Sequence, residues 1–316
     1  MFCSIIIPTI GRPSLDLAVQ SALDQRLADD DYEIIVVNDS GQSLLEADWQ
    51  SSSVVKIVET QRRDRCVARN TGAAVASGKY FCFLDDDDWL LPGALQALRM
   101  AELETEVWIY GGVQFVDEQG RHLGELNLGK HGNCLIETVS AVWIPLQASL
   151  IQAEAFFTVG GFDPLIPVNE DLDLCRRLAY IGEFANTKEL IATILRGVSW
   201  NSSTNTLLGL DLNRQGRDAM LVKRGVMKRL LESAGDSSFY HGRILHTYIG
   251  SVLHNIKLGR LWTAISRAIF AGMAIVLSGR YLFKTEYWRA LQTDTVTHEL
   301  ITEPSPEFST VAEWLH

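Results

Sequence analysis

The sequence predicts an α/β fold: a mostly parallel central sheet flanked by helices, with a helical extension at its carboxyl end. Three observations support this prediction. Short apolar runs at residues 4–8, 33–37 and 80–84 have the length and composition of buried strands. Segments of helical composition separate these runs, and strands that alternate with helices form mostly parallel sheets. Beyond about residue 205 the apolar residues recur with a helical period instead.

The first hundred residues divide at turn-forming residues. The predicted strands here are 4–8, 33–37, 54–58 and 80–84, and the predicted helices between them are 14–25 and 64–77. The second helix is rich in alanine and ends at Gly78, a common helix stop, directly before the last of these strands.

Four consecutive carboxylates, at 85–88, follow the last of these strands directly. Adjacent negative charges repel one another, so we expect a cation to offset them. If the extended conformation persists, alternation turns Asp85 and Asp87 to one side and Asp86 and Asp88 to the other. The resulting Asp-x-Asp pair suits Mg²⁺ or Mn²⁺, which bind a few carboxylates together with water and phosphate oxygens. The alternative is a solvated acidic turn in which Asp88 or a neighbour caps the next helix.

Polar side chains follow three successive strands. Thr9 ends the first strand, Asp39 the second, and the acidic cluster the third. Because ligands bind at the carboxyl ends of such strands, this set fits a metal-bound nucleoside diphosphate. Arg12 and Arg69 would add positive charge nearby. For Asp39 the alternative is an Asx turn that closes a strand. For Arg69 it is an ion pair on a helix surface, with Asp64 or Asp85.

The second half continues the sheet and carries another acidic motif. Two strands joined by a hairpin turn and a third apolar run are predicted at 107–114, 122–126 and 142–151. A helix then begins after Asn169, and its first turn holds three acids: Glu170, Asp171 and Asp173. The structural explanation is a cap by Asn169, acids placed against the helix dipole, and an ion pair from Asp173 to Arg176 or Arg177.

Composition excludes several classes of protein. A net charge of -11 and a sequence pI near 5.1 argue against a nucleic-acid partner. The five cysteines are odd in number, widely spaced and without a Cys-x-x-Cys pair, so neither a disulfide framework nor a zinc site is predicted. The first residues lack a basic segment and a long apolar run, and we therefore expect a cytoplasmic protein without a signal peptide.

Four motifs in order along the chain resemble one known family. They are SIIIPTIGRP at 4–13, EIIVVNDS at 33–40, ARNTGAAVASGKYFCFLDDDDWLLPGAL at 68–95 and GGFDPLIPVNEDLDLCRRL at 160–178. Together they resemble the inverting nucleotide-sugar glycosyltransferases of the GT-A fold, glycosyltransferase family 2. The resemblance covers roughly the first 200 residues.

This resemblance implies a domain organisation. A Rossmann-like GT-A catalytic domain is expected at 1–205, with a nucleotide-sugar half at about 1–105 and an acceptor half at about 106–205. A helical region at 206–292 and an acidic tail at 293–316 follow it.

The resemblance also implies a donor site. Its residues are Thr9, Arg12, Asp39, Arg69 and Asp85. Asp39 lies on the base of the nucleotide, Asp85 faces the ribose, and Asp87 with Asp85 binds Mn²⁺ or Mg²⁺. UDP is the expected nucleotide because it is the most frequent one in the family, and dTDP and GDP are the alternatives.

The chemistry that the resemblance implies is a single displacement at the anomeric carbon. Asp171 acts as the general base on an acceptor hydroxyl, and Glu170 orients Asp171 or binds a hydroxyl itself. The expected reaction moves one sugar from a nucleoside-diphosphate sugar to a glycan or a lipid-linked acceptor. The alternative is a catalytically inactive nucleotide-sugar-binding or scaffold subunit, against which four carboxylates count: Asp39, Asp85, Asp87 and Asp171.

Three features depart from the family pattern. Asn38 stands where another Asp is common. No late histidine occurs at 195–204, so Arg196 or Trp200 is expected to act in its place. The Gln-x-x-Arg-Trp signature of processive polysaccharide synthases is absent, which favours one transfer per encounter over polymerisation.

The carboxyl-terminal region is predicted to be helical, with an amphipathic helix at 240–256. Residues 257–289 carry six basic residues and one acid, and together with aromatic and apolar side chains they suggest an anionic membrane surface. The alternative is an ordinary helical cap or a homodimer contact. The uncharged segment at 268–279 would span about 18 Å as a helix, too short to cross a bilayer of about 30 Å.

Overall fold

The structure of the chain is a computed structural model that describes residues 1–25, 27–28, 31–102, 106–196 and 207–292. One nine-stranded sheet has the order β3-β2-β1-β4-β8-β6-β9-β5, and β7 pairs with β6 outside this path. The strands are β1 (Cys3–Thr9), β2 (Tyr32–Asn38), β3 (Val55–Glu59), β4 (Tyr80–Phe83), β5 (Trp89–Leu90), β6 (Glu106–Val116), β7 (His122–Leu126), β8 (Ser149–Gln152) and β9 (Glu183–Leu195).

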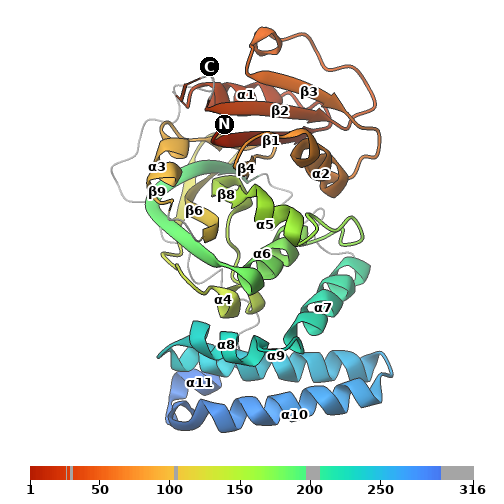
Figure 1. The fold of residues 1–316 in the computed structure, drawn as a ribbon, viewed down its shortest axis with the longest axis vertical. Coiled ribbons are helices and arrows are strands. Elements are labelled where there is room, and N and C mark those ends of the chain that lie inside the picture. Colours follow the sequence, from red (N-terminus) through yellow and green to blue (C-terminus); the bar gives the residue numbers. More distant parts are fainter. Residues whose placement is uncertain (26, 29–30, 103–105, 197–206, 293–316) are drawn as a thin grey trace.

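Helices lie on both sides of this sheet and below it (Figure 1). The α-helices are α1 (Leu15–Leu23), α2 (Arg65–Val75), α3 (Ala94–Met100), α4 (Leu135–Val139), α5 (Ala153–Thr158), α6 (Glu170–Ile181), α7 (Leu207–Leu221), α8 (Val226–Ala234), α9 (Ser238–Lys257), α10 (Leu261–Ser278) and α11 (Thr285–Arg289). The 3₁₀ helices are η1 (Asp48–Ser51), η2 (Leu146–Ala148) and η3 (Gly279–Phe283).

The amino-terminal half of the sheet is parallel, as the sequence predicts. β1 pairs in parallel with β2 and β4, and β2 with β3. Side chains alternate between two apolar cores: Ile6 belongs to one, and Ile5 and Ile7 belong to the other. The register sets Thr9 opposite Asn38, so the residues that follow these strands gather at one edge of the sheet.

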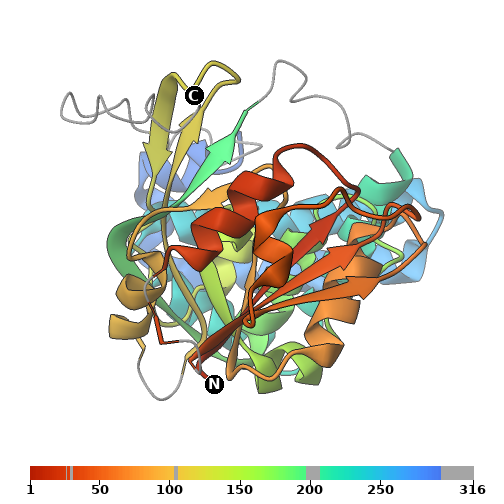
Figure 2. The ribbon, with the colours of Figure 1, turned by 90° about the horizontal axis from the view of Figure 1, so that it is seen from above.

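The second half of the sheet is mixed. β8 enters antiparallel between β4 and β6, and β6 runs parallel to β9 with three register shifts. Such irregularities bend long strands, and the hairpin of β6 and β7 projects beyond the body of the sheet (Figure 2). The α/β fold class with flanking helices and a helical extension is confirmed.

The strand predicted at 142–151 is mostly wrong. Only its last residues enter β8, and η2 precedes them. Pro145 has no N–H to offer a sheet ladder, and its carbonyl accepts a hydrogen bond of 2.6 Å from the Ser149 hydroxyl. The segment before β8 is therefore irregular, which leaves its side chains free to reach the site.

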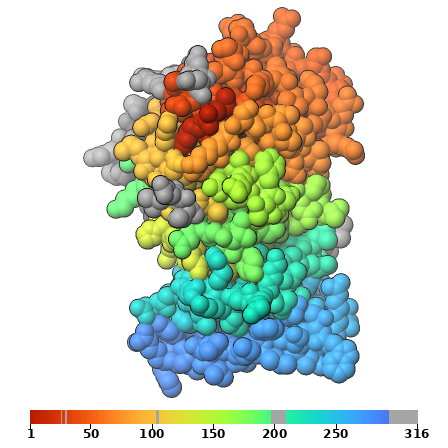
Figure 3. Space-filling model, in the orientation of Figure 1, coloured from red at the N-terminus to blue at the C-terminus, as the bar shows by residue number. Residues whose placement is uncertain are grey.

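A layer of helices, α7 to α11, forms the end of the molecule opposite β1 to β3 (Figures 1 and 3). The predicted helix at 240–256 is α9, which lies between the sheet region and α10. Arg243 of α9 donates hydrogen bonds to the carbonyls of Ser140 and Ala290, and so ties this layer to the rest of the chain. The five cysteines are buried and free. The predicted tail at 293–316 lies outside the described residues.

Candidate active site

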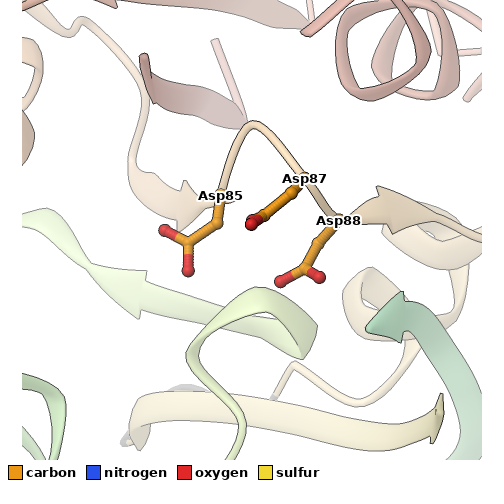
Figure 4. Close-up of side chains that lie close together, drawn as sticks. All are labelled: Asp85, Asp87 and Asp88. Atoms are coloured by element: carbon orange, nitrogen blue, oxygen red, sulfur yellow. The ribbon is translucent and has the colours of Figure 1, made fainter. Parts of the chain in front are cut away.

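The four carboxylates after β4 lie on a turn. The Asp88 N–H donates to the Asp85 carbonyl across 3.1 Å, and the turn carries Asp85, Asp87 and Asp88 toward one another (Figure 4). Carboxylate oxygens of these three residues lie within 4.8 Å of one another. The predicted convergence of Asp85 and Asp87 is confirmed. The prediction that Asp88 faces away with Asp86 is wrong, because a turn does not keep the alternation of an extended strand.

The electrostatics of this cluster favour a cation. Burial, and then the charges of Asp85 and Asp87, raise the pKa of Asp88 well above its ordinary value. Burial, and then Asp85, also raise the pKa of Asp87. A divalent ion relieves this repulsion, and three carboxylate oxygens are ligands that Mg²⁺ or Mn²⁺ prefers. The donor set therefore fits the predicted metal, with Asp88 added to the predicted ligands.

The acids do not cap the next helix, so that alternative is wrong. The residue before α3 is Gly93, which has a left-handed conformation with φ of 81° and forms no side-chain cap. The Asp88 carboxylate instead accepts a hydrogen bond of 3.0 Å from the backbone N–H of Leu195, the last residue of β9. The acidic turn is thus attached to the far side of the sheet.

Thr9 and Arg12 contact the acidic turn from the end of β1. The Thr9 hydroxyl donates to Asp86 across 2.6 Å. The Arg12 guanidinium donates to Asp86 and to Asp87, each across 2.8 Å. Asp86 therefore anchors the turn to the first strand while Asp85, Asp87 and Asp88 converge. Thr9 and Arg12 lie after the apolar part of the first strand, beside the acidic turn, as the sequence predicts.

Asp39 holds the loop between β3 and α2. Its carboxylate accepts hydrogen bonds from the Thr60 hydroxyl (2.5 Å) and from the backbone N–H groups of Arg62 (2.8 Å) and Asp64 (2.7 Å). Burial alone would raise the pKa of Asp39, but these hydrogen bonds, that of Thr60 first, hold it below its ordinary value. Asp39 is thus an ionised carboxylate at the predicted strand end. Its oxygens already accept hydrogen bonds from this loop, so a nucleotide base at Asp39 would share them with the loop.

The Asx turn expected as the alternative at Asp39 belongs to its neighbour. The Asn38 side-chain oxygen accepts from the backbone N–H and the hydroxyl of Ser40. A cavity of about 510 Å³ opens next to this turn, between the segments that follow β1 and β2. Its lining residues are Ile10, Gly11, Ser40, Gln42, Ser43, Leu44, Leu45 and Arg63.

Arg69 of α2 joins the two acidic motifs. Its guanidinium donates to Asp85 across 2.6 Å and to Glu170 across 2.8 Å, and it lies 5.2 Å from the centre of the Phe162 ring. The side chain is buried, so the surface position offered as the alternative is wrong, although the pairing with Asp85 is correct. One cation therefore fixes the acidic turn relative to the start of α6.

Asp171 is oriented by a tryptophan. The Trp143 indole N–H donates to one carboxylate oxygen of Asp171 across 2.9 Å, and the backbone N–H of Leu172 donates to the other across 2.8 Å. Both hydrogen bonds leave lone pairs on the carboxylate for another donor. Asp171 is half-buried, so a hydroxyl group can reach it.

The start of α6 differs in part from its structural explanation. Asn169 occupies the cap position, but it has a left-handed conformation with φ of 57° and its side chain forms no cap hydrogen bond. Asp173 pairs with Arg177 at 2.8 Å, as predicted. Asparagine adopts this conformation more readily than most other non-glycine residues, and residues in it are often found at functional sites.

Arg196 lies beside the same tryptophan. Its guanidinium carbon is 4.6 Å from the centre of the Phe115 ring and 5.7 Å from that of Trp143. Arg196 is therefore near the site, where the sequence predicts a substitute for a histidine. Trp200 lies outside the described residues.

Three residues of this site were missed in the sequence: Asp88, Trp143 and Gln147. The Gln147 amide donates to Asp85 across 2.9 Å. The signal for Gln147 was a polar residue inside an apolar run, which packing alone does not explain. For Trp143 the sequence held no signal, because an aromatic residue in an apolar run is typical of a core.

Comparison with known proteins identifies the class. The model of glycosyl transferase family 2 matches residues 4–162, half of the chain, and the chain belongs to this family. The match includes the acidic turn but ends before Glu170 and Asp171.

Curated relatives match this chain over part of their length. The uncharacterized glycosyltransferase YwdF of Bacillus subtilis is 33% identical over 119 residues, 37% of this chain and 43% of YwdF. Poly(ribitol-phosphate) beta-N-acetylglucosaminyltransferase TarP of Staphylococcus aureus is 30% identical over 124 residues, 37% of this chain and 38% of TarP. The GalNAc(5)-diNAcBac-PP-undecaprenol beta-1,3-glucosyltransferase of Campylobacter jejuni is 31% identical over 124 residues, 37% of this chain and 39% of the relative. The chain thus matches less than half the length of these relatives.

Solved structures share the fold over more of the chain. S. aureus TarS 1-349 in complex with UDP-GlcNAc superposes with a TM-score of 0.56 at 10% identity, over 84% of this chain and 90% of that one. A second structure, of S. aureus TarS, gives a TM-score of 0.57 at 12% identity, over 86% of this chain and 54% of that one. The GT-A fold expected from the resemblance is confirmed.

Proposed function

We propose that this protein is a metal-dependent inverting glycosyltransferase that moves one sugar from a UDP-sugar to a hydroxyl of a glycan or a lipid-linked acceptor. The observation that carries the proposal is the double contact of Arg69. It holds the carboxylate cluster of the donor side and the acidic start of α6 in one rigid arrangement. An inverting transfer needs a leaving-group site and a base at such a fixed separation.

The donor occupies the edge formed by the ends of β1, β2 and β4. Its nucleoside lies between Thr9 and Asp39 and extends over the cavity beside them. Asp85, Asp87 and Asp88 hold the divalent ion, which when bound stabilises the negative charge of the departing diphosphate. Arg12 keeps Asp87 directed to this cluster.

Asp171 takes the proton of the acceptor hydroxyl. The oxygen of that hydroxyl forms a bond to the anomeric carbon as the bond from this carbon to the diphosphate oxygen breaks. The Trp143 indole keeps the carboxylate in one orientation for this transfer. Glu170 stays paired with Arg69 and acts as a positioning residue.

Names of relatives support the donor and the stereochemistry. TarS is described in complex with UDP-GlcNAc and with UDP, and the TarP and Campylobacter names specify beta linkages. Inversion at an α-linked sugar nucleotide gives such a linkage. The same names specify a polyol-phosphate polymer and an undecaprenol-linked glycan as acceptors.

The test is turnover of UDP-GlcNAc and UDP-glucose with Mn²⁺ or Mg²⁺, with determination of the anomeric configuration of the product. We expect Asp171→Asn to lose turnover while it still binds UDP. The control, Glu154→Gln, changes an exposed carboxylate of α5 and should keep full turnover. Asp88→Asn should weaken metal-dependent UDP binding. Binding of UDP without turnover by the unaltered protein, with all acceptors tried, would favour the inactive binding subunit instead.

A further inference from the structure

Helix α10 is packed with its small and polar side inward. The residues that it buries are Ala264, Arg267, Ala271, Ala274 and Ser278. These positions recur at three- and four-residue spacings, so they form one stripe, and α10 lies beside helix α9 (Figure 1). An ordinary surface helix buries its large apolar residues instead.

The opposite side of α10 is large, apolar and exposed. Its large exposed apolar residues are Leu261, Trp262, Ile265, Ile269, Met273, Ile275, Val276 and Leu277. Trp262 is 85% exposed and Val276 77%, and Phe283, just beyond the helix, is 90% exposed. α9 adds a second exposed stripe of Ile249, Leu253 and Ile256. Monomeric soluble proteins rarely expose a continuous apolar surface of this kind.

The segment that carries this apolar face is rich in positive charge. No acidic residue occurs between Asp236 and Glu286, whereas this segment holds six Lys and Arg residues in a chain with a net charge of -11. Lys257 and Arg260 are exposed directly before α10, and Lys284 is exposed after it. Basic residues thus flank the apolar face at both ends.

A buried ion pair keeps α10 attached to the protein. Arg267 donates to Asp218 of α7 at 2.6 and 3.2 Å, and Asn255 of α9 donates to the same carboxylate. The sequence suggested that the uncharged segment at 268–279 is too short to span a bilayer. In the structure α10 extends on the amino-terminal side past Arg267, whose side chain is buried. By length and composition Leu261–Phe283, with a mean hydropathy of 1.6, is sufficient for a span. A crossing orientation would break the Arg267 pair, so this contact favours a helix that lies along a surface.

We propose that α10 and the exposed stripe of α9 form a docking surface for a membrane that contains anionic lipid. The helix lies in the plane of the interface, with Trp262 and Phe283 among the acyl chains and the flanking bases on the phosphates. A second copy of the chain fits less well, because an isologous contact brings the same unbalanced positive charges together. This proposal is independent of the transferase activity.

The test is co-sedimentation of the full chain with vesicles of phosphatidylcholine alone, or with about 30% phosphatidylglycerol. We expect binding to the anionic vesicles, and a blue shift of tryptophan fluorescence that Trp262→Ser diminishes. The double variant Trp262→Ser/Ile269→Ser should bind at least about tenfold more weakly, because it removes two large side chains from the apolar phase. The matched control, Met100→Ser/Leu123→Ser, replaces exposed apolar residues of α3 and β7 and should bind as the unaltered protein does.

A triple variant tests the electrostatic part. Lys257→Gln/Arg260→Gln/Lys284→Gln should bind anionic vesicles about tenfold or more weakly and lose the preference for them over neutral vesicles. Full-chain protein that stays in solution with anionic vesicles overturns the proposal, and so does equal binding by the Trp262/Ile269 variant. Sedimentation velocity decides a third outcome: self-association that this variant abolishes, without vesicle binding, makes the face an interface between copies.

Discussion

Arg69 is the residue whose loss should report most directly on the architecture of the site. Arg69→Met removes the guanidinium and keeps an unbranched side chain of similar length. Two charge-assisted hydrogen bonds, of 2.6 and 2.8 Å, disappear with it. Asp85 and Glu170 then lack their shared cation, and of the two only Asp85, 29% exposed at its side chain, has water close by.

The size of the effect follows from burial. Removal of one partner of a buried ion pair costs about 3–5 kcal/mol, because the remaining charge is left without compensation. Solvent screens the Asp85 part, and Arg65, whose guanidinium nitrogen lies 3.6 Å from Glu170, keeps part of the compensation there, so we expect a loss of about 3 kcal/mol in the free energy of unfolding. Burial, and then Asp171, already raise the pKa of Glu170. Without Arg69 this pKa rises further above the unfolded value, so the destabilisation should be largest at neutral pH and shrink as Glu170 becomes protonated on acidification.

The assay is urea unfolding of the metal-free protein at pH 7.5 and at pH 5.5. It compares the unaltered protein with Arg69→Met, Glu170→Gln and the double variant as a mutant cycle. An interval of about 2 pH units is wide enough to resolve the expected change in destabilisation. Glu170→Gln in the Arg69→Met background should recover about 1–2 kcal/mol, because it removes the more buried of the two charges that lost their shared cation. A loss below about 1 kcal/mol for Arg69→Met, or no recovery in the double variant, would refute the bridging role.

Three further predictions test other contacts. Trp143→Phe keeps an aromatic ring but removes the indole N–H that donates to Asp171, and should lower kcat about tenfold with little change in the KM for the sugar donor; an equal change in both would mean that the tryptophan binds substrate. Burial alone would raise the pKa of Asp218, but hydrogen bonds from Arg267, and then from Ser251 and Asn255, lower it. The ionised carboxylate therefore stabilises the fold above about pH 4, and this stabilisation is lost as the pH falls. Asp218→Asn should therefore be less stable than the unaltered protein at pH 7, with the difference narrowing below about pH 4 in denaturant titrations. A methyl group on Gly242 of α9 would lie 2.1 Å from a backbone carbonyl of α11, so Gly242→Ala should lower the melting temperature; Gly272→Ala, in open space on α10, should raise it slightly, and equal effects would contradict the packing.

Local patterns were sufficient for much of the fold. The apolar runs at 4–8, 33–37 and 80–84 became β1, β2 and β4 with ends shifted by at most one residue, because a buried parallel strand is apolar along its whole length. The same runs located the strand ends, and Thr9 does contact the acidic turn there, through Asp86. Strand-end chemistry was therefore readable before the fold was known.

Contacts between distant segments could not be read in this way. Arg69 and Glu170 are 101 positions apart, and Trp143 and Asp171 are 28 apart. The 142–151 run looked like a core strand, and only packing showed that it supplies Trp143 and Gln147 to the site. Asp88 joined its neighbours because the backbone turned, which alternation along an extended strand cannot predict.

The sequence by itself determined the α/β class, the parallel strands, the acidic cluster and the family, because strand periodicity and ordered motifs are properties of neighbouring residues. The tertiary structure decided which carboxylates converge, which cation joins the two acidic motifs, and which side of α10 is left exposed. The physical reason is that each of these depends on the direction in which a side chain points after distant elements pack. A buried cation such as Arg267 or Arg69 fixes that direction, because a buried charge is stable only beside a carboxylate that pairs with it.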